Sequence, residues 1–271
     1  MLRTLLSAAV LAACWSLAVH AQHSPVVKIR PEHAEVDANG TCPVRMVRVG
    51  PVCIDQYEAT VWSKPPGTDG APRGRQFGLA SDDYDCLGNG DDCVGKVFAV
   101  PLRGRFPSAY ITWFQAQHAC FNVGKRLPTN AEWQVAASGT PTDFEPGADD
   151  GVDDCNTTTA TVVSRTGARR HCVSSYEAYD MVGNLLEWVA DWMQGPTVPF
   201  APSLGTAGPD FGNDFMRGTN PAIAQNNGQN FPAALVRGGG YLGGTGAGVF
   251  ALNARFSPAD GGPDGGFRCV K

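Results

Sequence analysis

The sequence is poor in charged residues and in long apolar runs. Only 17% of its 271 residues are charged and the net charge is −5, so it lacks the net positive charge typical of nucleic-acid-binding proteins, and we expect no nucleic-acid partner. After residue 21 no apolar run is long enough to span a bilayer. The glycine-rich phosphate loop, the Gly-x-Ser-x-Gly elbow and the zinc-protease helix motif are also absent from the sequence, which excludes several common enzyme classes.

Residues 1–21 have the composition of an export signal. Arg3 supplies the positive charge, residues 5–19 are apolar, and a small-residue cleavage site precedes Gln22. Residues 11–14 also fit a bacterial lipobox ending at Cys14, which would give a lipid-anchored protein instead. The run is short for a transmembrane anchor. We therefore expect a secreted or periplasmic protein, bound to a membrane only if Cys14 is lipidated.

Cysteines are the clearest feature of the rest of the chain. Eight of the nine follow the signal, and none forms a Cys-x-x-Cys pair. An even number of cysteines in an exported chain is typical of disulfides, whereas zinc clusters usually need the closer spacing. We therefore expect four disulfides among the following cysteines: Cys42, Cys53, Cys86, Cys93, Cys120, Cys155, Cys172 and Cys269.

Glycine and proline predict many turns and short strands. The chain has 33 glycines and 20 prolines, and they are scattered along it. Residues 22–40 are polar and without periodicity, which indicates a flexible leader, so we place the domain at 41–271. Two short strands are expected on either side of Gly50 and Pro51, and residues 63–95 resemble a loop.

Two capping boxes predict two helices. Thr112 and Gln115 begin the first helix, which we expect to end before Gly124, and Thr129 and Glu132 begin the second, which we expect to run to about Ser138. The residues therefore predict an α+β fold with little regular secondary structure.

Five segments in order resemble the formylglycine-generating-enzyme (sulfatase-modifying-factor) family. The resemblance extends over residues 53–269, nearly the whole mature chain. It implies the family's C-type-lectin-like α+β fold. The segments are residues 53–60 (CIDQYEAT), 124–133 (GKRLPTNAEW), 180–188 (DMVGNLLEW), 236–239 (VRGG) and 266–269 (GFRC).

The resemblance also implies one disulfide. Members of the family join the first helix to the terminal GFRC segment, which corresponds here to Cys120–Cys269. Closure between nearest neighbours then suggests the pairs Cys42–Cys53, Cys86–Cys93 and Cys155–Cys172, although sequence alone does not fix their connectivity.

Calcium is the cofactor that the resemblance implies. The carboxylates of Asp180 and Glu187 and the backbone carbonyls of Gly183 and Leu185 match a structural calcium site of the family, and all are hard oxygen ligands. A second calcium site would begin at Asn156 and Thr157. The competing interpretation is that Glu187 only makes local hydrogen bonds.

The catalytic cysteine pair of the family has no counterpart here. Active members bind Cu(I) through two thiols set five residues apart, and soft thiolates suit that ion. Arg255 matches the arginine that follows the second thiol in the family. Counting back from it, the two thiol positions correspond to Ala247 and Leu252, and residues 238–268 contain no cysteine. Copper is therefore not expected. A relative that oxidises sulfur with non-haem iron needs three histidines, and the spacing of His23, His33, His118 and His171 suggests no such cluster.

Two functional hypotheses follow. The favoured one is a non-catalytic, calcium-stabilised binding or structural module that holds a peptide, glycan or protein ligand in the family's groove. The alternative is a metal-dependent oxidase or oxygenase of the family that acts on a thiol with other site residues. The missing thiol pair favours the module and leaves catalytic residues unassigned.

Overall fold

The computed structural model describes residues 41–141, 151–158, 160–193, 216–217 and 233–271. The expected signal, the leader and Cys14 lie outside these residues. Within the described part, no helix combines the length and the apolar character needed to cross a membrane.

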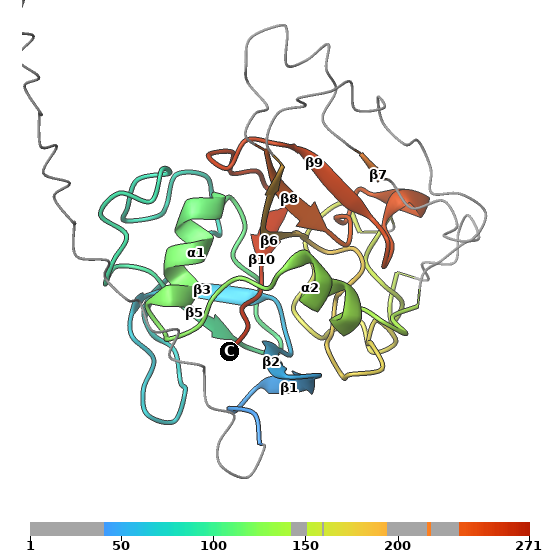
Figure 1. Ribbon diagram of the computed structural model, residues 1–271, viewed down its shortest axis with the longest axis horizontal. Helices are drawn as coiled ribbons and strands as arrows, with labels where there is room; N and C mark the ends of the chain where they lie inside the picture. The colour runs from blue at the N-terminus through green and yellow to red at the C-terminus, as the bar shows by residue number, and fades with distance from the viewer. Residues whose placement is uncertain (1–40, 142–150, 159, 194–215, 218–232) are drawn as a thin grey trace, which may run out of the picture. The chain divides into compact units, whose positions relative to one another are not determined.

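Short strands form three sheets in the described part of the chain. The hairpin on either side of Gly50 and Pro51 is confirmed, with β1 paired antiparallel to β2. The other two sheets have the strand orders β4-β3-β5 and β10-β6-β8-β9-β7 (Figure 1). The strands are β1 (Met46–Val49), β2 (Val52–Asp55), β3 (Ala59–Lys64), β4 (Arg73–Phe77), β5 (Phe98–Pro101), β6 (Leu186–Met193), β7 (Met216–Arg217), β8 (Ala233–Arg237), β9 (Leu252–Phe256) and β10 (Gly265–Phe267).

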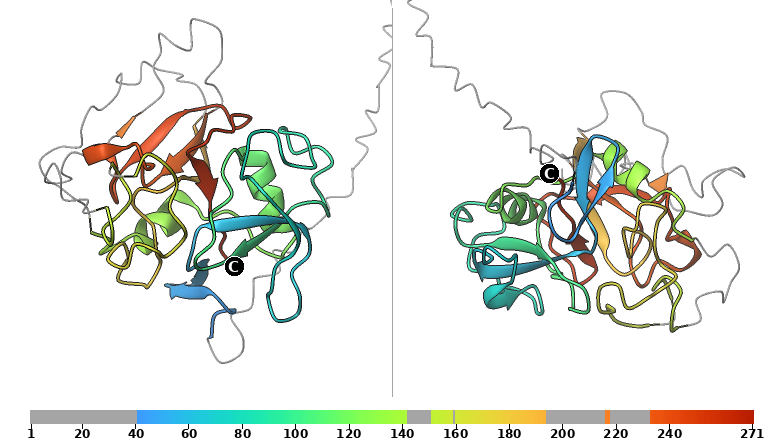
Figure 2. Two further views of the ribbon diagram at one scale, coloured as in Figure 1. Left: turned by 180° about the vertical axis from the view of Figure 1, so that it is seen from behind. Right: turned by 90° about the horizontal axis from the view of Figure 1, so that it is seen from below.

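Both helices begin where the capping boxes predicted. Helix α1 (Trp113–Phe121) is capped by Thr112 and α2 (Asn130–Ala136) by Thr129. In each capping box the side chain three residues later, Gln115 or Glu132, accepts a hydrogen bond from the backbone nitrogen of the capping threonine. The second helix ends earlier than the predicted Ser138. Helix α1 packs beside β5 of the three-stranded sheet, and α2 lies against β6 and β1 (Figures 1 and 2).

The loop predicted for residues 63–95 contains a strand. Strand β4 pairs antiparallel with β3, with Phe77 opposite Val61. Its first residues, including Arg73 and Gly74, are exposed and polar, so the sequence has none of the apolar alternation that marks a strand. Only the buried Phe77 anchors this edge strand to the core, which explains why the pattern missed it.

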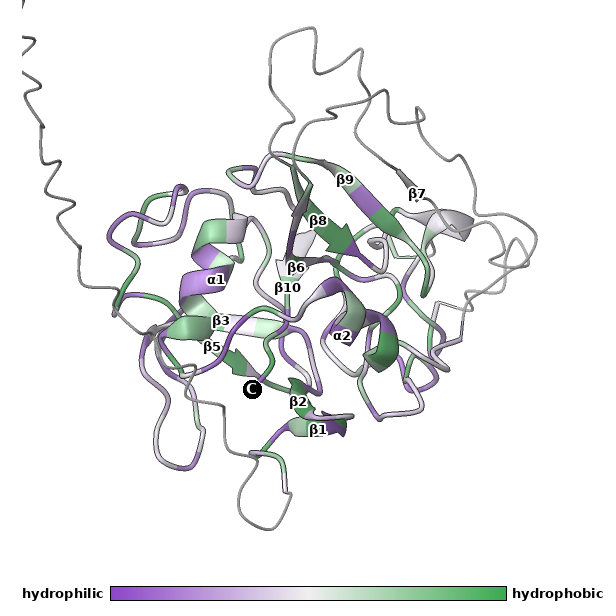
Figure 3. Ribbon diagram, viewed as in Figure 1, coloured by the Kyte–Doolittle hydropathy of each residue, from purple (hydrophilic) through white to green (hydrophobic). Residues whose placement is uncertain are grey.

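The core lies between the sheets and the helices. Strand β8 is buried along its whole length and is hydrophobic over most of it (Figure 3). A first cluster joins Trp188 and Phe267 to α1, and a second joins Trp133 and Met181 to β8. Val270 bridges to both Ile54 and Arg126, so the end of the chain closes the fold beside the β1–β2 hairpin.

All four expected disulfides are present. The bonds Cys42–Cys53, Cys86–Cys93 and Cys155–Cys172 close short loops of neighbouring cysteines. Cys120–Cys269 spans 149 residues and ties α1 to the C-terminal segment. Every cysteine of the described residues is therefore bonded.

Candidate functional site

The turn before β6 places the carboxylates and carbonyls of the predicted calcium site. Asp180, Gly183 and Asn184 all have positive φ, at 58°, 75° and 53°, a conformation that costs energy for the two residues with a Cβ atom. Gly183 is required here, since a Cβ atom would lie 2.3 Å from the Asn156 carbonyl oxygen. The turn is therefore packed directly against the segment that carries Asn156.

Asn184 joins the two predicted calcium sites. Its Nδ2 donates to Glu58 Oε2 at 2.5 Å, and its Oδ1 accepts from Asn156 Nδ2 at 3.1 Å. The backbone nitrogen of Leu185 donates to Glu58 Oε1 at 3.0 Å. Glu58, Asn156 and Asn184 are at most 1% exposed, so this network is removed from water.

Glu187 accepts more hydrogen bonds than Asp180 or Glu58. Arg268 Nη2 donates to its Oε1 at 2.5 Å, and Arg268 Nε lies within 2.9 Å of both oxygens. Trp133 Nε1 donates to Oε2 at 2.6 Å. These contacts occupy most of the acceptor capacity of Glu187.

Asp180 and Glu58 retain more free acceptor capacity. Asp180 Oδ2 accepts from the backbone nitrogen of Gly167 at 2.7 Å, and each oxygen of Glu58 accepts one of the bonds described above. Burial raises the pKa of Asp180 to about 7. Burial, together with the charges of Asp180 and Glu187, raises the pKa of Glu58 well above its usual range. The positive charges of Arg268 and Arg169 lower the pKa of Asp180, but two cations cannot fully offset three ionised carboxylates, so this site favours either protons or a further cation.

The residues present fit a hard cation better than a soft one. Asn156 Oδ1 is buried and has no hydrogen-bond partner, which leaves one amide oxygen available as a ligand. No group of three or more His, Cys, Asp or Glu side chains in the described ranges is arranged to hold a metal ion. A cation here would therefore need amide or backbone carbonyl oxygens, as the sequence predicted for Gly183 and Leu185.

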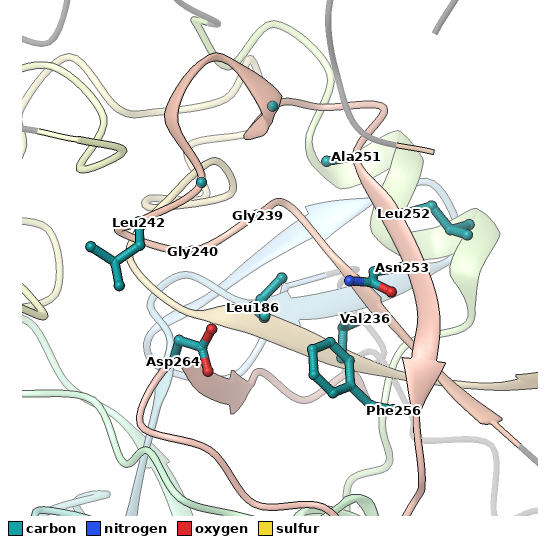
Figure 4. Close-up of a pocket in the computed structure, with 12 residues that line it drawn as sticks. Leu186, Val236, Gly239, Gly240, Leu242, Ala251, Leu252, Asn253, Phe256 and Asp264 are labelled. Atoms are coloured by element: carbon teal, nitrogen blue, oxygen red, sulfur yellow. The ribbon is translucent and has the colours of Figure 1, made fainter. Parts of the chain in front are cut away.

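Two adjoining hollows of about 200 and 350 Å³ form a groove along the five-stranded sheet. Figure 4 shows the residues that line the smaller hollow. Four residues line both hollows: Leu186, Val236, Phe256 and Asp264. Trp188 contributes to the floor and stacks edge-on against Phe256 at 6.2 Å between ring centroids. The groove walls are mainly apolar, with Asp264, Asp260 and Asn253 as polar groups.

The positions that match the family's thiols differ in their surroundings. Leu252 lines the groove at the start of β9. Ala247 is only 4% exposed and packs with the Cys155–Cys172 disulfide and Val182. A Cβ atom on Gly239 would lie 2.6 Å from the Ala247 Cα atom, so the chain approaches very closely there. Leu252 therefore presents a hydrocarbon side chain to the groove, whereas Ala247 is buried beneath neighbouring residues.

The two described histidines contribute to neither the groove nor the buried turn. His118 lies on α1 and packs near Gly90, whereas His171 is exposed beside Asp154 at 3.3 Å. Thr157, expected next to Asn156 in the second calcium site, is buried, and its carbonyl accepts from Gly244.

A comparison with protein families decides the classification. Residues 89–271, about two thirds of the chain, match the family described as Sulfatase-modifying factor enzyme 1-like domain. The chain belongs to this family. Its fold is accordingly the disulfide-bonded, C-type-lectin-like α+β fold that the five motifs predicted.

Relatives of this sulfatase-modifying-factor chain carry different names. The formylglycine-generating enzyme of Streptomyces coelicolor is 24% identical over 248 residues, which cover 76% of this chain and 72% of that enzyme. The serine/threonine-protein kinase pkn1 of Chlamydia caviae is 33% identical over 98 residues. That match covers 36% of this chain and 16% of the kinase, so the chain spans less than a fifth of the length of such relatives.

Solved structures with other names are also similar. The Major Tropism Determinant I1 variant has a TM-score of 0.47 and 20% identity, and the match covers 84% of this chain and 52% of that one. PvdO from Pseudomonas aeruginosa has a TM-score of 0.40 and 17% identity, with 81% of this chain and 79% of that chain covered.

Proposed function

We propose that this chain is an extracytoplasmic, calcium-stabilised binding or structural module of its family that does not generate formylglycine. One observation carries the proposal: the groove is present but has no thiol. Leu252 lines it, Ala247 is covered, and the cysteines of the described residues are all in disulfides. Cu(I) needs soft ligands, and hydrocarbon side chains supply none.

Calcium would be held by oxygen ligands at the turn before β6. Asp180, the carbonyls of Gly183 and Leu185, and a carboxylate from Glu187 or Glu58 would supply the first site, with Asn156 and Thr157 beginning the second. A bound calcium ion would offset the negative charge of the buried carboxylates. Support comes from the unpartnered Asn156 oxygen and from the incompletely bonded oxygens of Asp180 and Glu58.

The groove is the place where a ligand would bind. Pockets lined by apolar and aromatic side chains with a few polar groups are typical binding sites, and here Phe256 and Leu186 lie near Asp264 and Asn253. A peptide, a glycan or a partner protein would use these same groups. Four disulfides support a location in an oxidising compartment.

Metal analysis of the exported protein tests this proposal against an enzyme with other site residues. The protein is purified without chelators and its calcium, copper, iron and zinc contents are measured. The proposal predicts calcium and no stoichiometric copper or iron. A stoichiometric redox metal in the native protein would contradict the proposal and favour an oxidase or oxygenase.

A further inference from the structure

Three exposed arginines lie together on a surface that shares no residue with the groove. Segment 102–106 runs beside Thr166, where Gly104 N donates to Thr166 O at 2.8 Å and Thr166 N donates to Arg105 O at 2.9 Å. This pairing brings Arg165 next to Arg103 and Arg105, and all three are exposed. We call Arg103, Arg105, Phe106 and Arg165 the arginine surface.

Two of the guanidinium groups are held in place by aromatic rings. Arg165 lies 4.4 Å from the centroid of Phe106, and its Nη1 donates to the Gly104 carbonyl at 3.1 Å. Arg103 lies 5.6 Å from the centroid of Tyr179. Stacking of this kind orders a guanidinium before a ligand arrives and leaves donors on its edges.

The arginine surface has no acidic partner within the described residues. Some exposed cations do pair with carboxylates, as Arg75 does with Asp85 and Lys96 with Asp92. Arg103, Arg105 and Arg165 form no ion pair with any carboxylate of the described residues. Three uncompensated positive charges on a protein of net charge −5 form a local site for an anion.

We propose that the arginine surface binds an acidic polysaccharide through its carboxylate groups. The fork of a guanidinium matches a carboxylate in two parallel hydrogen bonds. Phe106, which remains 42% exposed beside Arg165, offers an apolar contact to a sugar ring.

The backbone of this surface favours a polysaccharide over an acidic peptide. The backbone polar groups of this surface already have hydrogen-bond partners. Segments 104–105 and 166 bond to each other, and the Gly104 carbonyl accepts from Arg165. The Phe106 carbonyl accepts from Gln76 at 2.7 Å. An extended peptide would gain few main-chain hydrogen bonds here, although peptide recognition commonly depends on them. A polymer that carries its charges on side groups needs only the guanidinium groups.

Binding to polygalacturonate tests the proposal, with dextran as the uncharged polymer and poly-L-glutamate as the acidic peptide. The key variant is Arg105→Glu, since the Arg105 side chain makes no hydrogen bond, ion pair or ring contact within the described residues, so the fold should be retained. Arg48→Glu, on the exposed face of β1, makes the same change in net charge outside the arginine surface. Melting curves of both variants check that they are folded.

We expect polygalacturonate to bind in low salt and to weaken as salt rises, with no binding of dextran. Arg105→Glu should weaken binding about tenfold, because a favourable charge becomes a repulsive one, and Arg48→Glu should change it less than about twofold. Absence of binding, or an equal loss in both variants, would overturn the proposal. Binding of poly-L-glutamate as tight as that of polygalacturonate would overturn the assignment to a polysaccharide.

Discussion

Arg268 and Glu187 form an ion pair that is almost completely shielded from solvent, with Arg268 Nη2 2.5 Å from Glu187 Oε1. The pair joins the segment after β10 to β6. Arg268 also donates to the carbonyls of Asp55 and Tyr179 at 3.0 and 2.8 Å. A single guanidinium therefore connects the C-terminal segment to Asp55 and to residues 179–187, three parts of the chain that are far apart in the sequence, which gives the arginine of the GFRC motif a structural role.

Loss of this arginine should destabilise the fold strongly. Arg268→Met leaves the buried Glu187 carboxylate without its partner, and such a loss costs about 3–5 kcal/mol. The matched control is Arg126→Met, because Arg126 is exposed and its partner Glu132 is partly exposed, so its loss should cost about 1 kcal/mol or less. Urea denaturation measures the free energy of unfolding of both variants. Equal losses would show that the buried pair stabilises the fold no more than the surface pair does.

The disulfides should differ in their contribution to stability according to loop length. In the chain-entropy model, replacing Cys120 and Cys269 by alanine removes a constraint over 149 residues and costs about 5 kcal/mol. The same replacement of Cys86 and Cys93, which are 7 residues apart, should cost about 2 kcal/mol. Chemical denaturation of the two double variants gives the order, and a larger loss for the short loop would contradict this account.

The helices, the first hairpin and the disulfides were predictable because each depends on local or counted features. The capping boxes at Thr112 and Thr129 mark the starts of the two helices. Cysteines that are neighbours in the sequence form disulfides that close short loops, as expected. Strand β4 was not predictable, because its pairing with β3 is a tertiary contact and its exposed Arg73 and Gly74 carry no strand pattern. Tertiary pairing of this kind overrides local propensity.

The candidate site was predicted only in part. The motif at residues 180–188 located the turn, but nothing in the sequence showed that Glu58, more than 120 residues earlier, accepts hydrogen bonds from Asn184 and Leu185. Its position in the CIDQYEAT segment was the available signal. The ion pair that occupies Glu187 was also missed, because Arg268 reaches it only through the folding of the C-terminal segment.

Calcium should raise the stability of the native protein. A ligand that binds only the native state at 100 times its dissociation constant adds about 2.7 kcal/mol, which corresponds to roughly 5–11 °C in melting temperature for a domain of this size. EDTA should therefore lower the melting temperature, and Asp180→Ala should remove the effect of EDTA. Asp69→Ala, at an exposed position, is the control that should keep it. A melting curve that EDTA leaves unchanged would contradict the calcium proposal.

The stability of the calcium-free protein should fall as pH rises. The pKa of Asp180 is about 7 in the folded chain against 3.8 as its ordinary value, so the folded state holds this proton more tightly than the unfolded state. Its contribution to stability is complete below about pH 3.8 and is lost as pH rises to about 7. Asp180→Asn should flatten this part of the profile in EDTA, which melting curves from pH 4 to 8 would show. A profile as steep as that of the unaltered protein would contradict this role of Asp180.

The most direct test of the central claim is an assay for formylglycine. The purified protein is supplied with copper, a reductant and a sulfatase-type cysteine peptide, and mass spectrometry follows conversion of the cysteine to the aldehyde. A formylglycine-generating enzyme serves as the positive control. Because Leu252 lines the groove, Ala247 is covered and the cysteines of the described residues are all in disulfides, we predict no aldehyde above the enzyme-free background. Conversion of the peptide by the unaltered protein would contradict the account and make the chain an enzyme.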